Sequence, residues 1–370
     1  MSVPISTLDE ASLRDVAERL GLPPWRGTQL HEAVWRPGVT ALDGVRQLPP
    51  AARDALGAEL RFTTVEVAAE SEADGGATVK LLSGLDGGLT VETVAMETRA
   101  SPRRARRATV CVSTQVGCAV GCPFCATGRA GLRRSCTAAE IVDQVRAASA
   151  ALHRRGLGPV THAVYMGMGE PLANYEATVE SLRILGSEAG ISPRRITVST
   201  SGVVPAIHRL ATEGLPVTLA ISLHAADDEL RDRLVPLNRA HPIDSLMAAG
   251  TAYAEATGRR LSLEWCLIGG VNDSEEQAAA LRRLAHAARA HVNVIPMNVI
   301  DGSPWGPPPA AATRRFLAAL RGVRATVRDT RGAATEAACG QLRATLETRR
   351  ALLPDGSLGP PRPVATRGAR

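Results

Sequence analysis

From residue 108 onward, strand-like segments alternate with helical patterns, and this alternation leaves the chain few folds to adopt. The strand-like segments occupy 108–113, 160–166, 195–199, 217–222, 261–267 and 291–295. Helical spacing appears between them at 138–152, 175–185, 205–213 and 275–289. Successive parallel strands need long crossover connections, which are usually helices. The sequence therefore predicts an α/β fold, a partial (β/α)6 barrel that is closed or partly closed.

The segments before residue 108 follow other patterns. Helical spacing over 9–20, after Pro24 and from Pro50 to about residue 60 predicts a small helical accessory domain at 1–61. Strand-like segments at 63–65, 78–81 and 89–94 predict a β-meander, which links that domain over 62–97 to a core at 98–345. The final segment, 346–370, is rich in Pro, Gly and Arg, so we expect a disordered basic tail.

The most informative chemistry lies in three closely spaced cysteines, Cys118, Cys122 and Cys125. A glycine and a proline separate them, and an interior proline costs a helix about 3 kcal/mol, so a loop is expected. Electron-transfer iron–sulfur clusters use four cysteines and structural zinc sites use four Cys or His ligands. Cys136, the next cysteine, lies beyond a Gly/Arg-rich stretch. A three-ligand cluster with one open iron is therefore favoured over zinc or unliganded thiols.

Turn residues, most of them polar, follow several predicted strands at their C-terminal ends. They are Gly169, Glu170, Ser199, Ser222, Leu223, His224 and Asn298. Each alone is equally consistent with a tight turn or a helix cap. In a barrel, however, the C-terminal ends of the strands meet at one rim, where active sites are built. Together with the cysteine loop, these turns favour a cofactor pocket, in which the Glu170 carboxylate can accept from an ammonium group.

The formal charge of +6 rests almost wholly on arginine, because Lys80 is the only lysine. Guanidinium groups suit phosphate, so the arginine clusters favour a nucleic-acid partner, although solvated faces explain any single cluster equally well. The N-terminal segment lacks the pattern of an export signal, and no apolar run approaches the roughly 18–20 residues of a membrane span. We expect a cytoplasmic monomer without a membrane partner. Seven cysteines, an odd number, also fit a reducing compartment.

Taken together, these motifs resemble the radical S-adenosylmethionine RNA methyltransferases of the RlmN/Cfr group, and the RlmN branch in particular. The shared segments occur in the family's order. They are CVSTQVGCAVGCPFCATG at 111–128, MGMGEP at 166–171, STSGVVP at 199–205, ISLHA at 221–225 and ACGQL at 338–342. The resemblance runs from about residue 91 to residue 342, with a looser match over the N-terminal helices.

The resemblance implies a radical S-adenosylmethionine barrel with a role for each motif. The three clustered cysteines would bind a [4Fe–4S] cluster, whose open iron chelates S-adenosylmethionine so that its reduction yields a 5′-deoxyadenosyl radical. The polar turn residues would contact S-adenosylmethionine. Cys339 would receive a methyl group and then attack an adenine carbon, Glu92 would accept the proton, and Cys111 would resolve the protein–RNA adduct through a disulfide with Cys339.

The implied reaction is methylation of C2 of an adenosine at the peptidyl-transferase centre of 23S rRNA, position 2503, with adenosine 37 of tRNA as a second candidate substrate. It would follow a ping-pong course with two molecules of S-adenosylmethionine and take electrons from a flavodoxin or a ferredoxin. Three alternatives remain open at this point. They are C8 methylation as in the Cfr branch, a paralogue with a non-RNA substrate, and a non-catalytic, metal-stabilised RNA-binding protein.

Overall fold

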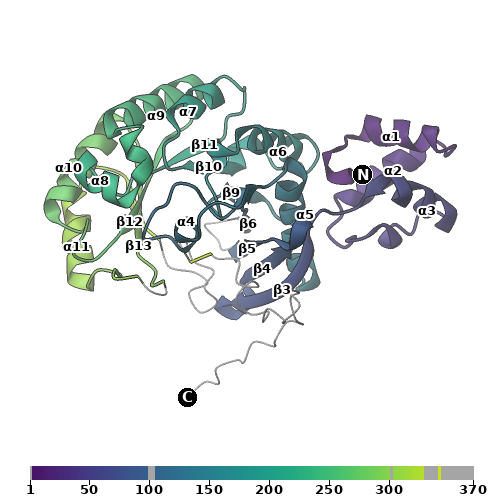
Figure 1. Cartoon of the computed structure of the whole chain (residues 1–370), viewed down its shortest axis with the longest axis horizontal. Helices are drawn as coiled ribbons and strands as arrows, with labels where there is room; N and C mark the ends of the chain where they lie inside the picture. Colours follow the sequence, from purple (N-terminus) through teal and green to yellow (C-terminus); the bar gives the residue numbers. More distant parts are fainter. Residues whose placement is uncertain (1, 99–104, 301–302, 329–340, 343–370) are drawn as a thin grey trace, which may run out of the picture.

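The computed structural model describes residues 2–98, 105–300, 303–328 and 341–342 (Figure 1). Its N-terminal unit contains α1 (Glu10–Arg19), α2 (Trp25–Val34) and α3 (Pro50–Glu59), which confirms the three predicted helices. The side chain of Asp9 caps α1 by accepting from the backbone N–H of Ser12. The helices enclose a small core of their own, which includes Leu13, Leu30 and Leu56. Beside them, β1 (Val3–Pro4) pairs in parallel with β2 (Leu60–Arg61).

The meander continues the main sheet. β3 (Glu66–Ala73), β4 (Thr78–Gly84) and β5 (Thr90–Thr98) are antiparallel neighbours, and β5 pairs antiparallel with β6 (Arg107–Cys111). The predicted first strand at 63–65 is wrong, because β3 begins at Glu66. Thr64 instead donates through its backbone N–H and its hydroxyl to Asp143, at 2.7 and 2.8 Å, and this anchor fixes the segment outside the sheet.

Parallel pairing continues from β6 to the other edge of the sheet. The order is β6, β9 (His162–Tyr165), β10 (Ile196–Thr200), β11 (Thr218–Ser222), β12 (Ser262–Leu267), β13 (His291–Pro296) and β14 (Ala325–Val327). The six predicted strands are confirmed, and β14 is an addition whose three residues are too few to show a pattern. In the described chain β3 and β14 are the two edges of this sheet and do not pair with each other, so the barrel is partial.

Helices follow the strands on the outside of the curved sheet (Figure 1). The four predicted ones are α5 (Ala138–Arg154), α6 (Tyr175–Ser187), α7 (Val204–Ala211) and α10 (Glu275–Ala287). The structure adds α4 (Ala126–Ala130), α8 (Asp228–Leu234), α9 (Ile243–Thr257) and α11 (Ala310–Ala319). In the sequence, Gly250 interrupts the helical pattern of α9. It is instead a packing position, since a Cβ there would lie 2.6 Å from Ile221 of β11.

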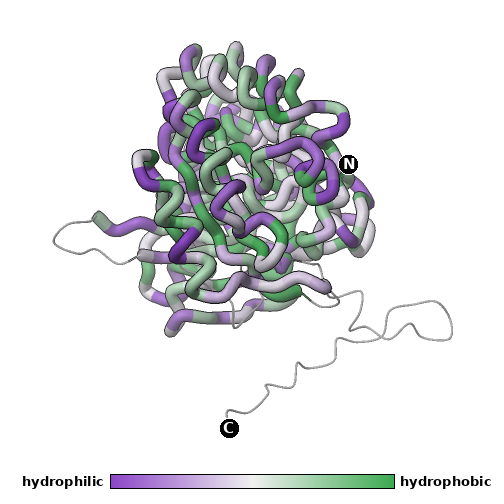
Figure 2. The backbone as a smooth tube through the Cα atoms, turned by 90° about the vertical axis from the view of Figure 1, so that its left-hand side faces the viewer, coloured by the Kyte–Doolittle hydropathy of each residue, from purple (hydrophilic) through white to green (hydrophobic). Residues whose placement is uncertain are grey.

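One large apolar core fills the space between the sheet and these helices, and Trp265, Tyr165 and Phe316 are among its largest fully buried side chains. Figure 2 shows hydrophobic stretches running through the middle of the molecule and hydrophilic stretches gathered toward its outside. In the described part of the chain, no helix combines the length and the apolar character needed to cross a membrane.

The N-terminal unit rests against α5 and α6. Arg146 of α5 donates to the backbone carbonyls of Val34 and Phe62, at 3.0 and 2.7 Å, and to Asp143. His31 of α2 contacts Glu188, directly after α6, at 2.8 Å. The helical unit therefore joins the barrel through these polar contacts and through Trp35, which packs against the cores of both units, while the other apolar side chains of the unit form a core of their own.

Candidate active site

The three cysteines lie in a loop, as the glycine and proline between them predict. No helical turn occurs between β7 (Gln115–Val116) and α4. The base of the loop closes where the backbone N–H of Cys118 donates to the carbonyl of Gly131, at 3.1 Å. Gly117 makes this closure possible. Its φ is +78°, and a Cβ there would stand 1.7 Å from the same carbonyl oxygen.

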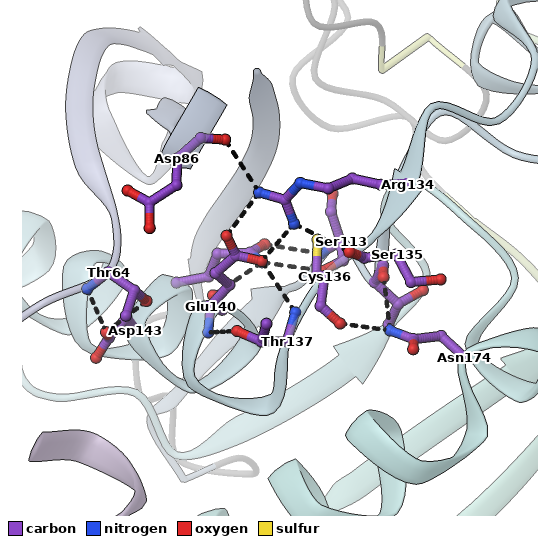
Figure 3. A network of polar contacts seen from close by, with 12 residues as sticks. Thr64, Asp86, Ser113, Arg134, Ser135, Cys136, Thr137, Glu140, Asp143 and Asn174 are labelled. Atoms are coloured by element: carbon purple, nitrogen blue, oxygen red, sulfur yellow. Dashed lines mark hydrogen bonds and ion pairs between the residues drawn. The ribbon is translucent and has the colours of Figure 1, made fainter. Parts of the chain in front are cut away.

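A polar network holds the segments on both sides of this loop (Figure 3). β8 (Arg134–Ser135) pairs with β7, and Arg134 forms two hydrogen bonds with Glu140 of α5. Glu140 also completes a capping box with Thr137 at the start of α5. From the next strand unit, Asn174 donates to the carbonyls of Thr114 and Cys136. The cysteine loop therefore emerges from a base fixed to α5 and to the loop after β9.

All three thiols line one large pocket at the C-terminal ends of the parallel strands. The pocket contains about 1080 Å³ of empty space, including the part that is open to solvent. Burial raises the pKa of Cys118 to about 12 and holds the pKa of Cys122 well above its usual value. Ionising neighbouring thiols here requires a cation between them, so the donor set fits an iron–sulfur cluster in type and in place.

The ligand geometry is not preformed. In the described ranges of the chain, no three His, Cys, Asp or Glu side chains are positioned to hold a metal ion. Cys118 and Cys125 are half-buried, Cys122 is buried, and each is a free thiol.

The strand-end turns meet at the same pocket. Its lining includes Gly169, Glu170, Ser199, Ser222, His224 and Asn298. Leu223 is fully buried beside them and is absent from the lining. Gly167 and Gly169 allow neighbouring segments of the chain to pack closely against the backbone. A Cβ at Gly167 would lie 2.5 Å from the carbonyl oxygen of Val112, and one at Gly169 would lie 2.6 Å from Cβ of Gln115.

Glu170 is a buried carboxylate fixed by backbone groups. Its two oxygens accept from the backbone N–H groups of Leu172, at 3.0 Å, and Ser201, at 2.7 Å. Its own N–H donates to the side chain of Gln115. Burial raises the pKa of this carboxyl above its ordinary value. A cationic group in the pocket would favour the charged form of Glu170. This agrees with the expectation from the sequence that the Glu170 carboxylate accepts from an ammonium group.

His224 is held as a neutral donor. Its Nδ1 accepts from the backbone N–H of Cys266 at 2.9 Å, so the neutral ring carries its proton on Nε2. Burial lowers the pKa of His224 to about 3, with a smaller contribution from the charge of Arg231. The edge of the ring packs against Phe124 of the cysteine loop, with 4.9 Å between ring centroids. His224 also has a φ of +60°, which is uncommon for a residue other than glycine, and the contacts that fix its position hold the backbone there.

The sequence analysis missed Arg231 of α8, whose fully buried side chain organises the pocket loops. Its guanidinium donates to the carbonyls of Ser201, Ser222 and Leu223, at 2.7, 3.1 and 3.0 Å, and to the side chain of Asn238. Burial lowers its pKa to about 10. The sequence does not indicate this role, because an arginine in a short charged helix is expected to be exposed to solvent.

Glu264 and Cys266 of β12 also line the pocket. Glu264 is buried and accepts from the side chains of Ser262 and Asn293, both at 2.7 Å, and burial raises its pKa. A carboxylate within an apolar strand is a signal that could have identified it. Cys266 is half-buried at the pocket wall.

Glu92 and Cys111 lie outside the pocket lining, on adjacent strands of the same sheet. Cys111 is buried and lies opposite Val94 of β5. The carbonyl of Glu92 accepts from the hydroxyl of Ser113, which in turn accepts from the backbone N–H of Met168 near Glu170. One hydroxyl therefore connects the Glu92 strand to the pocket loop after β9.

Cys339 lies outside the described residues, as do the predicted tail at 346–370 and its arginines. Two residues after Cys339, Gln341 and Leu342, are described, and one of them reaches the pocket. Leu342 lines it, and its carbonyl accepts from the hydroxyl of Thr127 at 2.6 Å. Gln341 donates to the carbonyl of Val299.

Comparisons with known proteins agree with this site. A family described as the Radical SAM superfamily matches residues 112–282. The probable dual-specificity RNA methyltransferase RlmN of Parafrankia sp. (strain EAN1pec) is 46% identical, over 92% of this chain and 91% of its own length. The corresponding protein of Moorella thermoacetica is 46% identical over 90% of this chain and 94% of its own.

A crystal structure of a radical SAM methyltransferase from Sphaerobacter thermophilus superposes with a TM-score of 0.86 at 45% identity, over 92% of this chain and 99% of that one. Each of these three matches covers at least 90% of this chain. The chain therefore belongs to the RlmN family of radical SAM RNA methyltransferases.

Proposed function

We propose that this methyltransferase modifies C2 of adenosine 2503 in 23S rRNA and of adenosine 37 in tRNA. The relatives' description as dual-specificity RNA methyltransferases supports two RNA substrates. The observation that carries the proposal is the single pocket in which three cysteine thiols face Glu170, His224 and the serine turns. This donor set suits an iron–sulfur cluster beside a ligand that has an ammonium group and hydroxyls.

We assign the cluster to Cys118, Cys122 and Cys125, which must draw together as it binds. Bound there, the [4Fe–4S] cluster and S-adenosylmethionine would supply radical chemistry, which adenine C2 needs because an amidine carbon is not a nucleophile. Glu170 would bind the ammonium group of S-adenosylmethionine. His224 would donate from Nε2. Gly169, Leu223 and Asn298 would complete the site, together with Ser199 and Ser222, whose hydroxyl oxygens lie 3.3 Å apart.

Three further residues complete the proposed reaction. Cys339 carries the transferred methyl group and forms the bond to the substrate carbon, and Glu92 takes the proton from that carbon. Cys111 then attacks the sulfur of Cys339, so that a disulfide forms as the bond between that sulfur and the transferred carbon breaks. The released carbon takes up a proton and becomes the methyl group of the RNA, and an external reductant resets the disulfide. The position of Leu342 in the pocket wall supports a role for its segment there.

The remaining assignments concern partners. We propose that the helical unit at 1–61 contacts RNA, that a flavodoxin or ferredoxin supplies electrons, and that the enzyme acts in the cytoplasm as a monomer. RNA affinity should fall as salt rises if arginines meet phosphates, and the slope of log affinity against log salt counts those contacts.

The decisive test of the cysteine roles uses the resolving thiol. In cluster-loaded enzyme, Cys111→Ala should accumulate a covalent protein–RNA adduct, visible as a shifted band on a denaturing gel. The double variant with Cys339→Ala should give none. An active single variant that forms no adduct contradicts both assigned roles.

A second test settles the methylated atom. RNA treated with the enzyme is digested, and its methyladenosine is compared by chromatography and mass spectrometry with 2-methyl and 8-methyl standards. Co-elution with the 8-methyl standard would replace the C2 assignment by C8. Methylation of rRNA without tRNA would remove the second substrate.

A further inference from the structure

The sequence has 43 lysines and arginines, and Lys80 is the only lysine among them. It is also one of the least exposed, with 12% of its side chain accessible, and its Nζ lies 3.2 Å from Oε1 of Glu92. The Glu92 side chain is only 3% exposed. Burying a carboxylate is costly unless it is paired, so this ammonium group offsets part of the cost of burying the Glu92 charge.

Strand register places this pair on the same face of the sheet as Cys111. Lys80 is directly opposite Val94, and Val94 is directly opposite Cys111. Glu92 is two residues before Val94, so its side chain points to the same face. The proposed proton acceptor, the resolving thiol and the lysine therefore share one surface across β4, β5 and β6.

α5 covers the opposite face of these strands, so its side chains do not compete with the ion pair between Lys80 and Glu92. Thr93, next to Glu92, donates to Gln144 of α5. Glu70 and Glu72 of β3 form ion pairs with Arg154 and Arg155 at the end of α5.

The register also identifies the other ionisable groups on the Glu92 face of the described strands. On β3 to β9 they are Glu66, Lys80, Arg107, Cys111 and His162, and the more distant strands β12 and β13 add Glu264, Cys266 and His291. Among them Lys80 is the one that forms a described ion pair with Glu92.

We propose that Lys80 is a positioning residue for Glu92. Its ammonium group keeps the Glu92 carboxylate ionised and holds it on the face of the sheet that also carries Cys111. The inference rests on the proposed role of Glu92 as proton acceptor. A lysine suits the position better than an arginine, because an ammonium is a compact point charge with three donors. A guanidinium would bring five donors into a place with little water to satisfy them.

The test compares Lys80→Met with wild type in two measurements on the full chain. The first is an infrared titration of Glu92 in the metal-free protein, taken as the difference from Glu92→Gln, which needs no loaded enzyme. The second is the pH dependence of single-turnover methylation of RNA. Removing the ammonium makes the buried carboxylate harder to ionise, so both the infrared midpoint and the acid limb of the rate profile should move up by about 1–3 pH units.

Two controls separate charge from general damage. Arg106→Met breaks another ion pair to a buried glutamate of β5, Arg106–Glu97 at 2.7 Å, on the other face of the sheet, and should leave both titrations unchanged. Lys80→Arg keeps the charge and should restore the acid limb toward wild type. Lys80→Gln replaces the methionine variant if that one does not fold.

The outcomes are distinct. Wild-type midpoints in the folded neutral variant, in both measurements, overturn the role of Lys80. An equal shift in Arg106→Met also overturns it, because the effect would then follow from any broken pair. Full methylation by Glu92→Gln would instead remove Glu92 as the proton acceptor, whatever the Lys80 variants show.

Discussion

At the residue scale, His224 shows how burial fixes a chemical state. Its pKa is about 3 in the folded protein, against an ordinary value of 6.5, so the unfolded chain binds a proton that the folded chain excludes between these values. Stability should therefore fall as pH falls through this range. His224→Asn keeps an acceptor and tolerates positive φ, but does not titrate. Urea unfolding measures the free energy of unfolding at pH 6.5 and at pH 4.5. We expect the loss between these two pH values to be smaller in the variant than in wild type, by up to about 3 kcal/mol. Equal losses would contradict the assignment.

Arg231 gives a second prediction at this scale. Its guanidinium joins the loops after β10 and β11 through three carbonyls. Arg231→Met should leave those carbonyls without their donor and cost about 3–5 kcal/mol, with weakened S-adenosylmethionine binding as the loops separate. Urea unfolding and calorimetric binding check the two effects. Arg183→Met, which removes an exposed arginine paired with Glu213, is the matched control and should change neither.

At the element scale, the closure of the cysteine loop depends on one glycine. Gly117→Ala would force a Cβ against the carbonyl of Gly131 and strain a backbone at φ +78°. We expect a loss of about 1–3 kcal/mol and a clear drop in iron bound after anaerobic reconstitution. Gly131→Ala has a similar φ, +71°, but open space around its Cβ, so it should lose less of both. Similar iron content in the two variants would show that closure does not limit cluster assembly.

At the scale of the whole molecule, Arg146 connects the helical unit to the barrel. Arg146→Met should raise the rate of limited proteolysis near 60–66 by about tenfold, since lost bonds to a charged donor are worth about 1.5–3 kcal/mol. The barrel should stay resistant. Arg154→Met, which removes a more exposed ion pair from the same helix, should leave the cleavage pattern unchanged. Cleavage that rises equally in both variants would contradict a specific role for Arg146 in holding the two units together.

The sequence by itself determined the local elements and the chemistry of the loop. Period, capping residues and turn residues act over a few positions, so the six parallel strands, the three N-terminal helices and the loop around Cys118 could be predicted. The motifs at strand ends could be placed at one rim because parallel strands share a direction. The shifted start of β3 could not be predicted, since Asp143, far along the chain, holds Thr64 outside the sheet.

Only the tertiary structure decided which ordinary residues belong to the site. Arg231 and Lys80 each occur in a segment that could equally be solvated, and their roles depend on burial and on partners from other elements. The distance between Lys80 and Glu92 follows from the register of two strands, which a single sequence does not encode locally. Burial then sets the charge state of each group, because the cost of a charge depends on the dielectric that the whole fold creates around it.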